Sequence, residues 1–284
     1  MKISKHLLHG DAVQKVGFTA FPNKSGPFKA GLPDTIVIHF TAGRDRQSAV
    51  KTLIDPTVKA SAHLVVGRDG SVTQLAPFNE ICWHAGKSAY DGRVGLNEFS
   101  IGIEIDNAGR LERQGDGFFS WFGRQYPREE VFEGVHRNES ESSYWHRFQE
   151  RDIETVREIC LLLIRAYGLK LILGHEEIAP GRKTDPGPAF PLDRLREKLL
   201  AADRDENDPP APAASKALAS GVVIASSLNI RRDPVASAPK AADPLPLGSP
   251  VRILARKPGW LYVSAECRGW VSSEFIKESG GKVV

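Results

Sequence analysis

What the sequence has little of already excludes several classes of protein. Only 3 of the 284 residues are cysteine, they are widely scattered, and none forms a CxxC pair. An odd, scattered set argues against a disulfide framework and favours buried or free thiols in a reducing compartment. We expect Cys82 and Cys160 to be packing residues rather than nucleophiles. No apolar segment reaches the ~20 residues that span a bilayer, so we expect no membrane insertion.

The amino terminus and the charge balance lack two further signals. Residues 1–10 are basic but hold no apolar stretch of ~7–15 residues, so we expect no export signal and a protein that is cytoplasmic as made. The formal net charge of +3 is a mild bias, and no recognition motif accompanies it, so we expect no nucleic-acid partner. A hydrophobic content of 41% is ordinary for a globular protein.

Three separated segments, by contrast, carry residues that are typical of a catalytic zinc site. His39 ends an apolar β-branched run, and His175 and Asp185 flank a turn rich in proline and glycine. A catalytic zinc takes three protein ligands and one water, whose pKa it lowers from ~16 to ~7. We therefore expect His39, His175 and Asp185 to bind Zn²⁺.

Two other residues in these segments have the chemistry that amide hydrolysis needs. Glu104 lies in the run Ile-Gly-Ile-Glu-Ile, and Lys183 lies in the turn beside Asp185. A carboxylate can take and pass on a proton, and a lysine can stabilise a developing oxyanion. Each residue alone has an ordinary structural explanation, as a strand histidine, a buried acid or part of a rigid loop. Their combination favours a hydrolase.

The same segments resemble the zinc-dependent N-acetylmuramoyl-L-alanine amidases (amidase type 2) related to peptidoglycan-recognition proteins. The resemblance covers about residues 34–195 and is most specific in the loop 174–190. It implies hydrolysis of the amide between N-acetylmuramic acid and the L-alanine of the stem peptide. It also implies three zinc ligands and two catalytic residues: His39, His175 and Asp185, with Glu104 and Lys183.

Further motifs of this family surround a substrate groove. Matching segments contain His63 in Ser-Ala-His, Trp83 and His84 in Trp-His-Ala-Gly, and Asn97 in Asn-Glu-Phe-Ser. The resemblance implies that these four residues contact substrate. One departure concerns Ala62, because some relatives carry a tyrosine there that polarises the reacting centre. That role then falls to the catalytic acid and lysine.

Three hypotheses of function follow from these residues. The first is an amidase acting on peptidoglycan or on muropeptides, and the complete ligand set favours it. The second is a peptidoglycan-binding protein that does not cleave, and the third is a zinc hydrolase of some other amide. An amidase without an export signal either recycles wall fragments in the cytoplasm or reaches the wall as a phage-type lysin. The sequence leaves the oligomeric state open.

The hydrophobic pattern predicts an α/β fold with a mixed central sheet flanked by helices. A proline near each expected helix end, or a glycine such as Gly168, marks the boundaries. An Asp-Gly pair predicts a hairpin. The expected strands are 35–39, 63–66, 71–75, 99–105 and 169–173, and the expected helices are 48–54 and 153–167.

A polar stretch with many aromatic residues separates two of these elements. Between residues 109 and 151 we expect a long irregular insertion, which is either a lid or binding wall for sugars or a surface excursion packed by its own aromatics. His136 and His146 lack ligand spacing with another candidate. They are therefore expected to be solvent or structural histidines.

The carboxyl-terminal third changes composition. We expect a catalytic domain over residues 1–200, a linker rich in alanine and proline over 201–219, and a small all-β domain over 220–278. The last resembles bacterial SH3-like domains, which implies wall or peptide attachment. The alternative is that it only packs on the catalytic domain. Its expected strands are 228–234, 247–254, 259–263 and 268–276, with Trp270 in the core.

Overall fold

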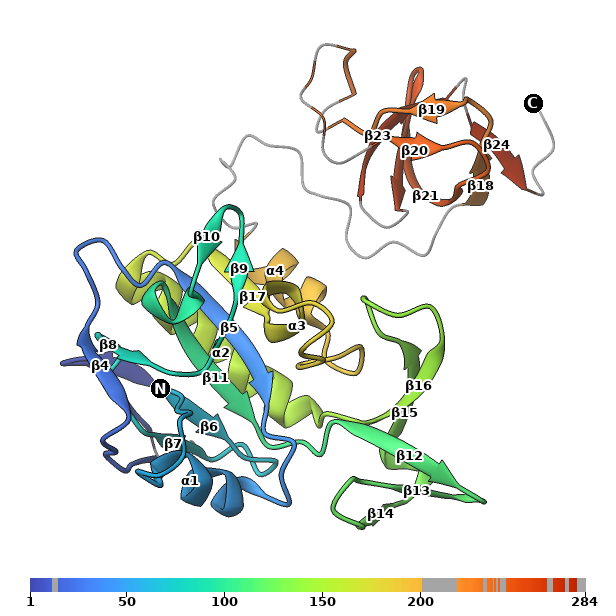
Figure 1. Ribbon diagram of the computed structural model, residues 1–284. Helices are drawn as coiled ribbons and strands as arrows, with labels where there is room; N and C mark the ends of the chain where they lie inside the picture. Colours follow the sequence, from blue (N-terminus) through green and yellow to red (C-terminus); the bar gives the residue numbers. More distant parts are fainter. Residues whose placement is uncertain are drawn as a thin grey trace. The chain divides into compact units, whose positions relative to one another are not determined.

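The chain divides into two units, Met1–Asp203 and Arg204–Val284, each with its own hydrophobic core (Figure 1). The computed structural model describes residues 1–11, 15–200, 219–231, 234–236, 238, 240, 244–264, 268–273 and 276–279. The expected linker, 201–219, lies outside the described residues except for its last position.

A six-stranded mixed sheet forms the centre of the first unit. Its parallel strands carry β-branched runs that are buried on both faces, as crossover connections require. The predicted mixed α/β architecture is confirmed, and so is the hairpin β6–β7. The strands lie in the order β17 (Leu171–Gly174), β5 (Thr35–Phe40), β11 (Ser100–Ile105), β6 (Leu64–Val66), β7 (Val72–Gln74) and β3 (Val16–Phe18).

Alternation along the strands gives the sheet two different faces. Ile36 and Ile38 on β5, like Ile103 on β11, pack with helix α2 in the main core. The intervening residue Val37 joins a separate cluster on the opposite face. His39 follows Val37 by two positions, so the period-2 rule places it on that same face, away from α2.

Four α-helices and two short 3₁₀ turns complete the layers of the described part of this unit. Helix α2 packs across one face of the sheet (Figure 1), while Ala49 of α1 belongs to a buried cluster with Val65 on the other. Gly168 caps α2 with a φ of 66°, as predicted. The helices and turns are α1 (Arg46–Ile54), η1 (Leu96–Glu98), η2 (Arg128–Glu130), α2 (Glu150–Tyr167), α3 (His175–Ile178) and α4 (Leu192–Leu200).

The insertion between β11 and α2 is a regular sheet, so the prediction of an irregular segment is wrong. Its five strands are short and are stabilised by a small core that includes Phe118, Tyr126 and Val131. Such short strands form only when segments distant in the sequence pair with one another. Their alternation of polar and apolar residues is weak, so the sequence pattern did not predict them. The strand order is β14 (Gln125–Tyr126), β13 (Gly117–Phe119), β12 (Arg110–Gln114), β16 (Ser142–His146) and β15 (Val131–Val135).

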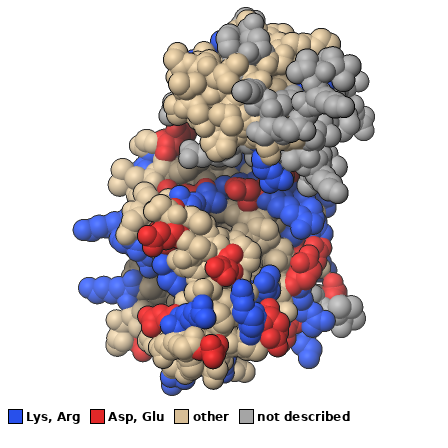
Figure 2. All heavy atoms as spheres, turned by 90° about the vertical axis from the view of Figure 1, so that its right-hand side faces the viewer, with Lys and Arg blue, Asp and Glu red and all other residues tan. Residues whose placement is uncertain are grey.

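Among the described residues, three two-stranded ribbons lie outside the two larger sheets of the first unit. Each pairs antiparallel: β1 (Lys2–Ser4) with β2 (Leu7–His9), β4 (Lys24–Pro27) with β8 (Glu80–Cys82), and β9 (Ala89–Tyr90) with β10 (Arg93–Val94). Figure 2 shows that Lys and Arg alternate with Asp and Glu on one face of this unit. That mixture agrees with the small net charge.

The second unit contains a five-stranded antiparallel sheet and a two-stranded ribbon. Within the expected strand 228–234, the described residues pair only at Leu228 and at an isolated bridge of Arg231, so 229–230 do not form the expected strand, and 232–233 lie outside the described residues. The side chain of Trp270 lies outside the described residues. The strands are β23 (Arg268–Ser272), β22 (Trp260–Ser264), β21 (Pro250–Lys257), β18 (Ala219–Val223) and β24 (Ile276–Ser279), with β19 (Ser227–Leu228) and β20 (Leu245–Pro246) as the ribbon.

Two of the three cysteines can be placed. Cys82 and Cys160 are both free and buried, and burial raises the pKa of each thiol. Neither is therefore a nucleophile, as expected. Cys267 lies outside the described residues. No helix in the described part of the chain is long and apolar enough to cross a membrane.

The amino terminus of α2 contains a buried acid whose ionisation opposes folding. Asp152 accepts a hydrogen bond from the Gln149 backbone through Oδ2, but its buried Oδ1 has no partner among the described residues. Burial raises the pKa of Asp152 to about 6, above the ~3.9 of an unfolded chain. The folded state thus binds this proton more tightly than the unfolded state does.

We predict that the wild-type protein loses stability, relative to Asp152→Asn, as the pH rises from about 4 to about 6. The reason is that the folded state must give up the Asp152 proton in this window, while asparagine does not titrate. Thermal unfolding of both proteins at several pH values measures the difference. A pH-independent gap in Tm between the two would contradict the prediction.

Candidate active site

The predicted metal ligands meet at the carboxyl ends of adjacent parallel strands. His39 lies near the end of β5, and His175 follows directly after β17, which pairs with β5. Glu104 is the register partner of His39 on β11, on the other side of β5. Asp185 reaches the same point from the loop that follows α3. Four residues separated by up to 146 positions therefore share one edge of the sheet.

The three ligand atoms face one another at short distances. His39 Nδ1 lies 3.0 Å from His175 Nδ1 and 2.8 Å from Asp185 Oδ2, and His175 Nδ1 lies 3.0 Å from the same carboxylate oxygen. In a tetrahedral zinc site with bonds of about 2.0–2.1 Å, donor atoms lie roughly 3.3 Å apart. The observed triangle is slightly smaller than that, and all three residues are buried.

Hydrogen bonds at the far nitrogens determine which tautomer each ring adopts. His175 Nε2 lies 3.2 Å from the Ala85 carbonyl oxygen, which can only accept, so Nε2 carries the proton. His84 Nε2 likewise donates to the Ser100 carbonyl at 3.1 Å. His84 Nδ1 is then an acceptor, and His39 Nε2 donates to it at 3.0 Å. Both Nδ1 atoms at the triangle are therefore lone pairs.

This arrangement fits a divalent cation. Two imidazole lone pairs and a carboxylate oxygen converge without a proton between them, which is repulsive unless a positive charge lies at the centre. Burial, and next the neighbouring His175, lower the pKa of His39 to about 4, so its ring is neutral at pH 7. Burial raises the pKa of Asp185, but the close approach of the two histidines outweighs it and keeps the carboxylate ionised.

The two expected catalytic residues lie beside this triangle. Burial raises the pKa of Glu104 well above its usual value, the charge of Asp185 raises it further, and the charge of Lys183 opposes both. The positive charge of Lys183 also lowers the pKa of His39, so its field reaches the same centre. Glu104 Oε2 is buried and has no hydrogen-bond partner among the described residues. Such an atom is suited to a proton on a substrate or a water molecule.

Two residues expected to contact substrate have structural positions instead. His63 is fully buried, accepts from the Gly102 backbone at 3.0 Å and donates to the Glu80 carbonyl at 2.8 Å. His84 is also buried and packs against Gly102, where a Cβ would lie 2.4 Å from its ring. Because neither ring presents a free polar atom, substrate contact by these histidines is corrected to a supporting role.

The other two expected substrate residues are more accessible. Trp83 is partly exposed, and its Nε1 donates to Ser25 Oγ at 2.7 Å. Asn97 Oδ1 accepts from the backbones of His84 and Ala85 at 3.0 and 2.7 Å, and thereby holds the carbonyl to which His175 donates. Asn97 thus acts on the metal triangle through the backbone.

Glu176 is a buried residue that the sequence analysis did not identify. It joins the insertion between β11 and α2 to the loop that carries Asp185, which we call the metal loop. Glu176 follows the ligand His175, and its backbone N–H donates to the Asp185 carbonyl at 2.8 Å. Its Oε2 accepts from His136 Nε2 at 2.8 Å and from the Gly187 backbone at 2.9 Å. Arg137 Nε donates to Oε1 at 2.7 Å. The insertion therefore braces the loop that carries Asp185.

An aromatic contact strengthens this brace. Gly187 adopts a φ of +70°, and a Cβ there would lie 2.9 Å from the ring of Trp145, a fully buried residue of the insertion. His136 is structural, as expected, because it bonds Glu176, and His146 contacts Glu130 in the same manner at 3.3 Å. The only sequence signal for the brace was the acidic pair that follows His175.

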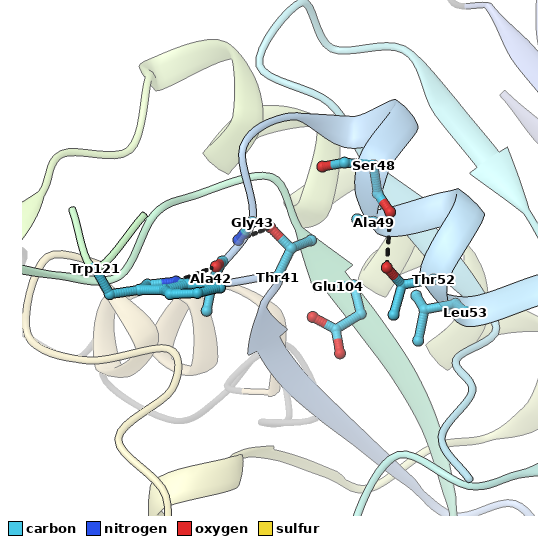
Figure 3. Close-up of a pocket in the computed structure, with 9 residues that line it drawn as sticks. All are labelled: Thr41, Ala42, Gly43, Ser48, Ala49, Thr52, Leu53, Glu104 and Trp121. Atoms are coloured by element: carbon cyan, nitrogen blue, oxygen red, sulfur yellow. Dashed lines mark hydrogen bonds between the residues drawn. The ribbon is translucent and has the colours of Figure 1, made fainter. Parts of the chain in front are cut away.

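A cavity of about 300 Å³ opens beside Glu104. Figure 3 shows the Glu104 carboxylate pointing into it from β11, with helix α1 on one side and the loop after β5 on the other. Trp121 of the insertion reaches this loop and donates from Nε1 to the Ala42 carbonyl at 2.7 Å. The insertion thus combines both expected roles, since Trp121 forms a wall while Phe118 and Tyr126 pack it internally.

Comparison with known proteins agrees with this site. Curated relatives include N-acetylmuramoyl-L-alanine amidase AmiD of Escherichia coli, 30% identical over 67% of this chain and 62% of AmiD. Another is 1,6-anhydro-N-acetylmuramyl-L-alanine amidase AmpD of E. coli, 32% identical over 49% of this chain and 58% of AmpD. The chain therefore spans about three fifths of the length of these relatives.

A solved structure of E. coli AmiD, in complex with the substrate anhydro-N-acetylmuramic acid-L-Ala-D-γ-Glu-L-Lys, is also similar. It is 29% identical, with a TM-score of 0.44, over 66% of this chain and 70% of that one. Residues 29–188, more than half of this chain, match the family described as N-acetylmuramoyl-L-alanine amidase (Amidase_2). With the ligand triangle and Glu104 inside the matched region, the chain belongs to this amidase family.

Proposed function

We propose that this chain hydrolyses the amide bond between N-acetylmuramic acid and the L-alanine of peptidoglycan stem peptides, with a bound Zn²⁺. The observation that carries the proposal is the convergence of two imidazole lone pairs and one carboxylate beside a buried, unpartnered glutamate. Family membership and the names of AmiD and AmpD support the choice of bond.

The residues divide the work as follows. His39, His175 and Asp185 hold the metal, which when bound lowers the pKa of water to ~7 and polarises a carbonyl. Glu104 takes a proton from the attacking water and passes it to the leaving amide nitrogen. Burial raises the pKa of Glu104, which favours its uptake of a proton from the attacking water.

Lys183 supplies the positive charge of the site. Its influence on the pKa of both Glu104 and His39 indicates that its field reaches the centre where the carbonyl oxygen becomes negative. The side chain of Ala62 is buried and has no polar atom, so it takes no part in this stabilisation. The proposed oxyanion stabilisation therefore relies on Lys183 and the metal.

The presence of the second unit favours a polymeric substrate over a small soluble one. We propose that residues 220–278 form an SH3-like domain that attaches the enzyme to the wall, since a small soluble fragment needs no anchoring module. Its antiparallel sheet and separate core support a self-contained domain. On this proposal, the enzyme acts on peptidoglycan that it reaches outside the cytoplasm, as a phage-type lysin does.

We predict that Glu104→Gln keeps its zinc but loses turnover by about 10²–10⁴-fold, because glutamine cannot take up the proton. Release of stem peptides from peptidoglycan, followed by mass spectrometry, and zinc content by atomic absorption measure the two effects. Glu98→Gln, an exposed acid in η1, is the matched control. Normal turnover in Glu104→Gln would remove this residue from the mechanism, and a wild-type protein that binds peptidoglycan without releasing peptides would indicate a binder.

We predict that His136→Ala lowers the affinity for zinc by about 10–100-fold, because the brace on Glu176 then no longer fixes the loop that carries Asp185. Competition with a chromogenic chelator measures the affinity, and circular dichroism checks the fold. His9→Ala, an exposed histidine, is the control. An unchanged zinc affinity in a folded His136→Ala protein would show that the brace has no influence on the site.

We predict that the chain shortened to residues 1–203 cleaves soluble muropeptides at the wild-type rate but cleaves intact sacculi at least tenfold more slowly. The first unit keeps its complete core and the whole site, whereas attachment to the polymer is lost. Parallel assays on both substrates separate attachment from catalysis. Equal losses on both substrates would argue that the second unit only stabilises the first.

A further inference from the structure

The cavity beside Glu104 has a composition that selects among the parts of a muropeptide. Its lining consists of small residues, hydroxyl residues, one acid and one indole: Thr41, Ala42, Gly43, Ser48, Ala49, Thr52, Leu53, Glu104 and Trp121. No lysine, arginine or histidine belongs to this lining among the described residues. Among the lining side chains, a ligand carboxylate placed here would meet the acid Glu104 and no positively charged group.

The hydroxyl groups of helix α1 face the cavity as hydrogen-bond acceptors. Thr52 Oγ1 donates to the Ser48 carbonyl at 3.0 Å (Figure 3), and Ser48 Oγ donates to the Asp45 carbonyl at 2.8 Å while accepting from the Asp45 backbone N–H at 3.2 Å. Each hydroxyl donates its only proton to a backbone carbonyl. Its oxygen retains a lone pair that can accept a hydrogen bond from a donor on a ligand. The cavity therefore suits a neutral molecule that is rich in O–H and N–H groups.

Trp121 provides the apolar surface of the cavity. The residue is 73% exposed. Leaving so much of an indole ring in water is unfavourable, which indicates that a ligand covers the ring. It is nevertheless held in place, because its Nε1 bonds the carbonyl of Ala42, a non-glycine residue with a φ of 48°. Phe122 packs edge-on against it at 5.6 Å, and Arg124 bonds the Arg44 carbonyl at 3.1 Å.

We infer that this cavity is a subsite for the N-acetylated pyranose ring of the substrate, and that Trp121 is the platform on which the sugar stacks. A pyranose has an apolar C–H face for the indole and hydroxyl and acetamido donors for Ser48 and Thr52. The stem peptide carries free carboxylates, such as that of a γ-linked glutamate, and lies outside this cavity. The insertion thereby acts as a sugar-specificity element.

This inference rests on the proposed function for the identity of the substrate, but binding tests it without turnover. The sugar probe is N-acetylmuramic acid whose lactyl carboxyl is reduced to an alcohol, because this molecule is neutral and cannot be hydrolysed. The peptide probe is N-acetyl-L-Ala-D-γ-Glu-L-Lys. Isothermal titration calorimetry of each probe with the full zinc-loaded chain gives two dissociation constants, and peptide release from peptidoglycan is measured separately.

Trp121→Ala should weaken binding of the sugar probe at least tenfold and change binding of the peptide probe less than twofold. Trp121→Phe keeps an aromatic face and should bind the sugar within about threefold of wild type. Val135→Ala changes another exposed apolar residue of the same insertion, one that does not line the cavity, and this matched control should bind both probes normally.

Several results would overturn the subsite. These are sugar binding that survives Trp121→Ala, loss of peptide binding in place of sugar binding, a Trp121→Phe protein as weak as Trp121→Ala, or a wild-type protein that binds only the peptide probe. If the wild-type enzyme releases stem peptides while any of these holds, the sugar assignment fails and the amidase function stands. If it binds the sugar but releases no peptide, the amidase function fails and the subsite stands.

Discussion

The convergence of three electron-pair donors at one point is the constraint on which the rest of this structure depends. Two imidazoles and a carboxylate approach within 3.0 Å of one another, and hydrogen bonds on their far sides leave no proton in the gap. Such a group is costly in a protein interior unless a cation occupies its centre. The surrounding structure therefore has to hold the donors rigidly.

Much of the first unit is organised to meet that requirement. The parallel pairing of β5 with β17 and β11 aligns His39 with the residue after Gly174 and with Glu104. His84 fixes the tautomer of His39, and it fits there because Gly102 has no side chain. The family resemblance places the motifs of His63 and His84 around the substrate groove, but both side chains are buried supports. His84 orients the metal ligand His39, and His63 accepts a hydrogen bond from the backbone of β11.

The insertion of residues 110–146 links the metal loop and the cavity. Its His136 and Arg137 bond Glu176 beside the metal ligands, while Trp121 at its other end meets the loop after β5. One small sheet therefore contacts both the loop that carries Asp185 and the wall facing Glu104. Its internal aromatic core gives this sheet the rigidity that both contacts need.

The sequence by itself determined the elements and the chemistry of the ligands. Apolar runs with β-branched residues predicted the strands before His39 and His175, helical spacing predicted α2 up to its cap at Gly168, and the residue types indicated zinc. These features are local, so periodicity and motif spacing can reveal them. Only the tertiary structure decided that His63 and His84 are buried, that the insertion is a sheet, and that Glu176 and Trp121 join it to the site. The reason is physical: burial, tautomers and cavity walls arise from contacts between residues tens of positions apart, which no local pattern encodes.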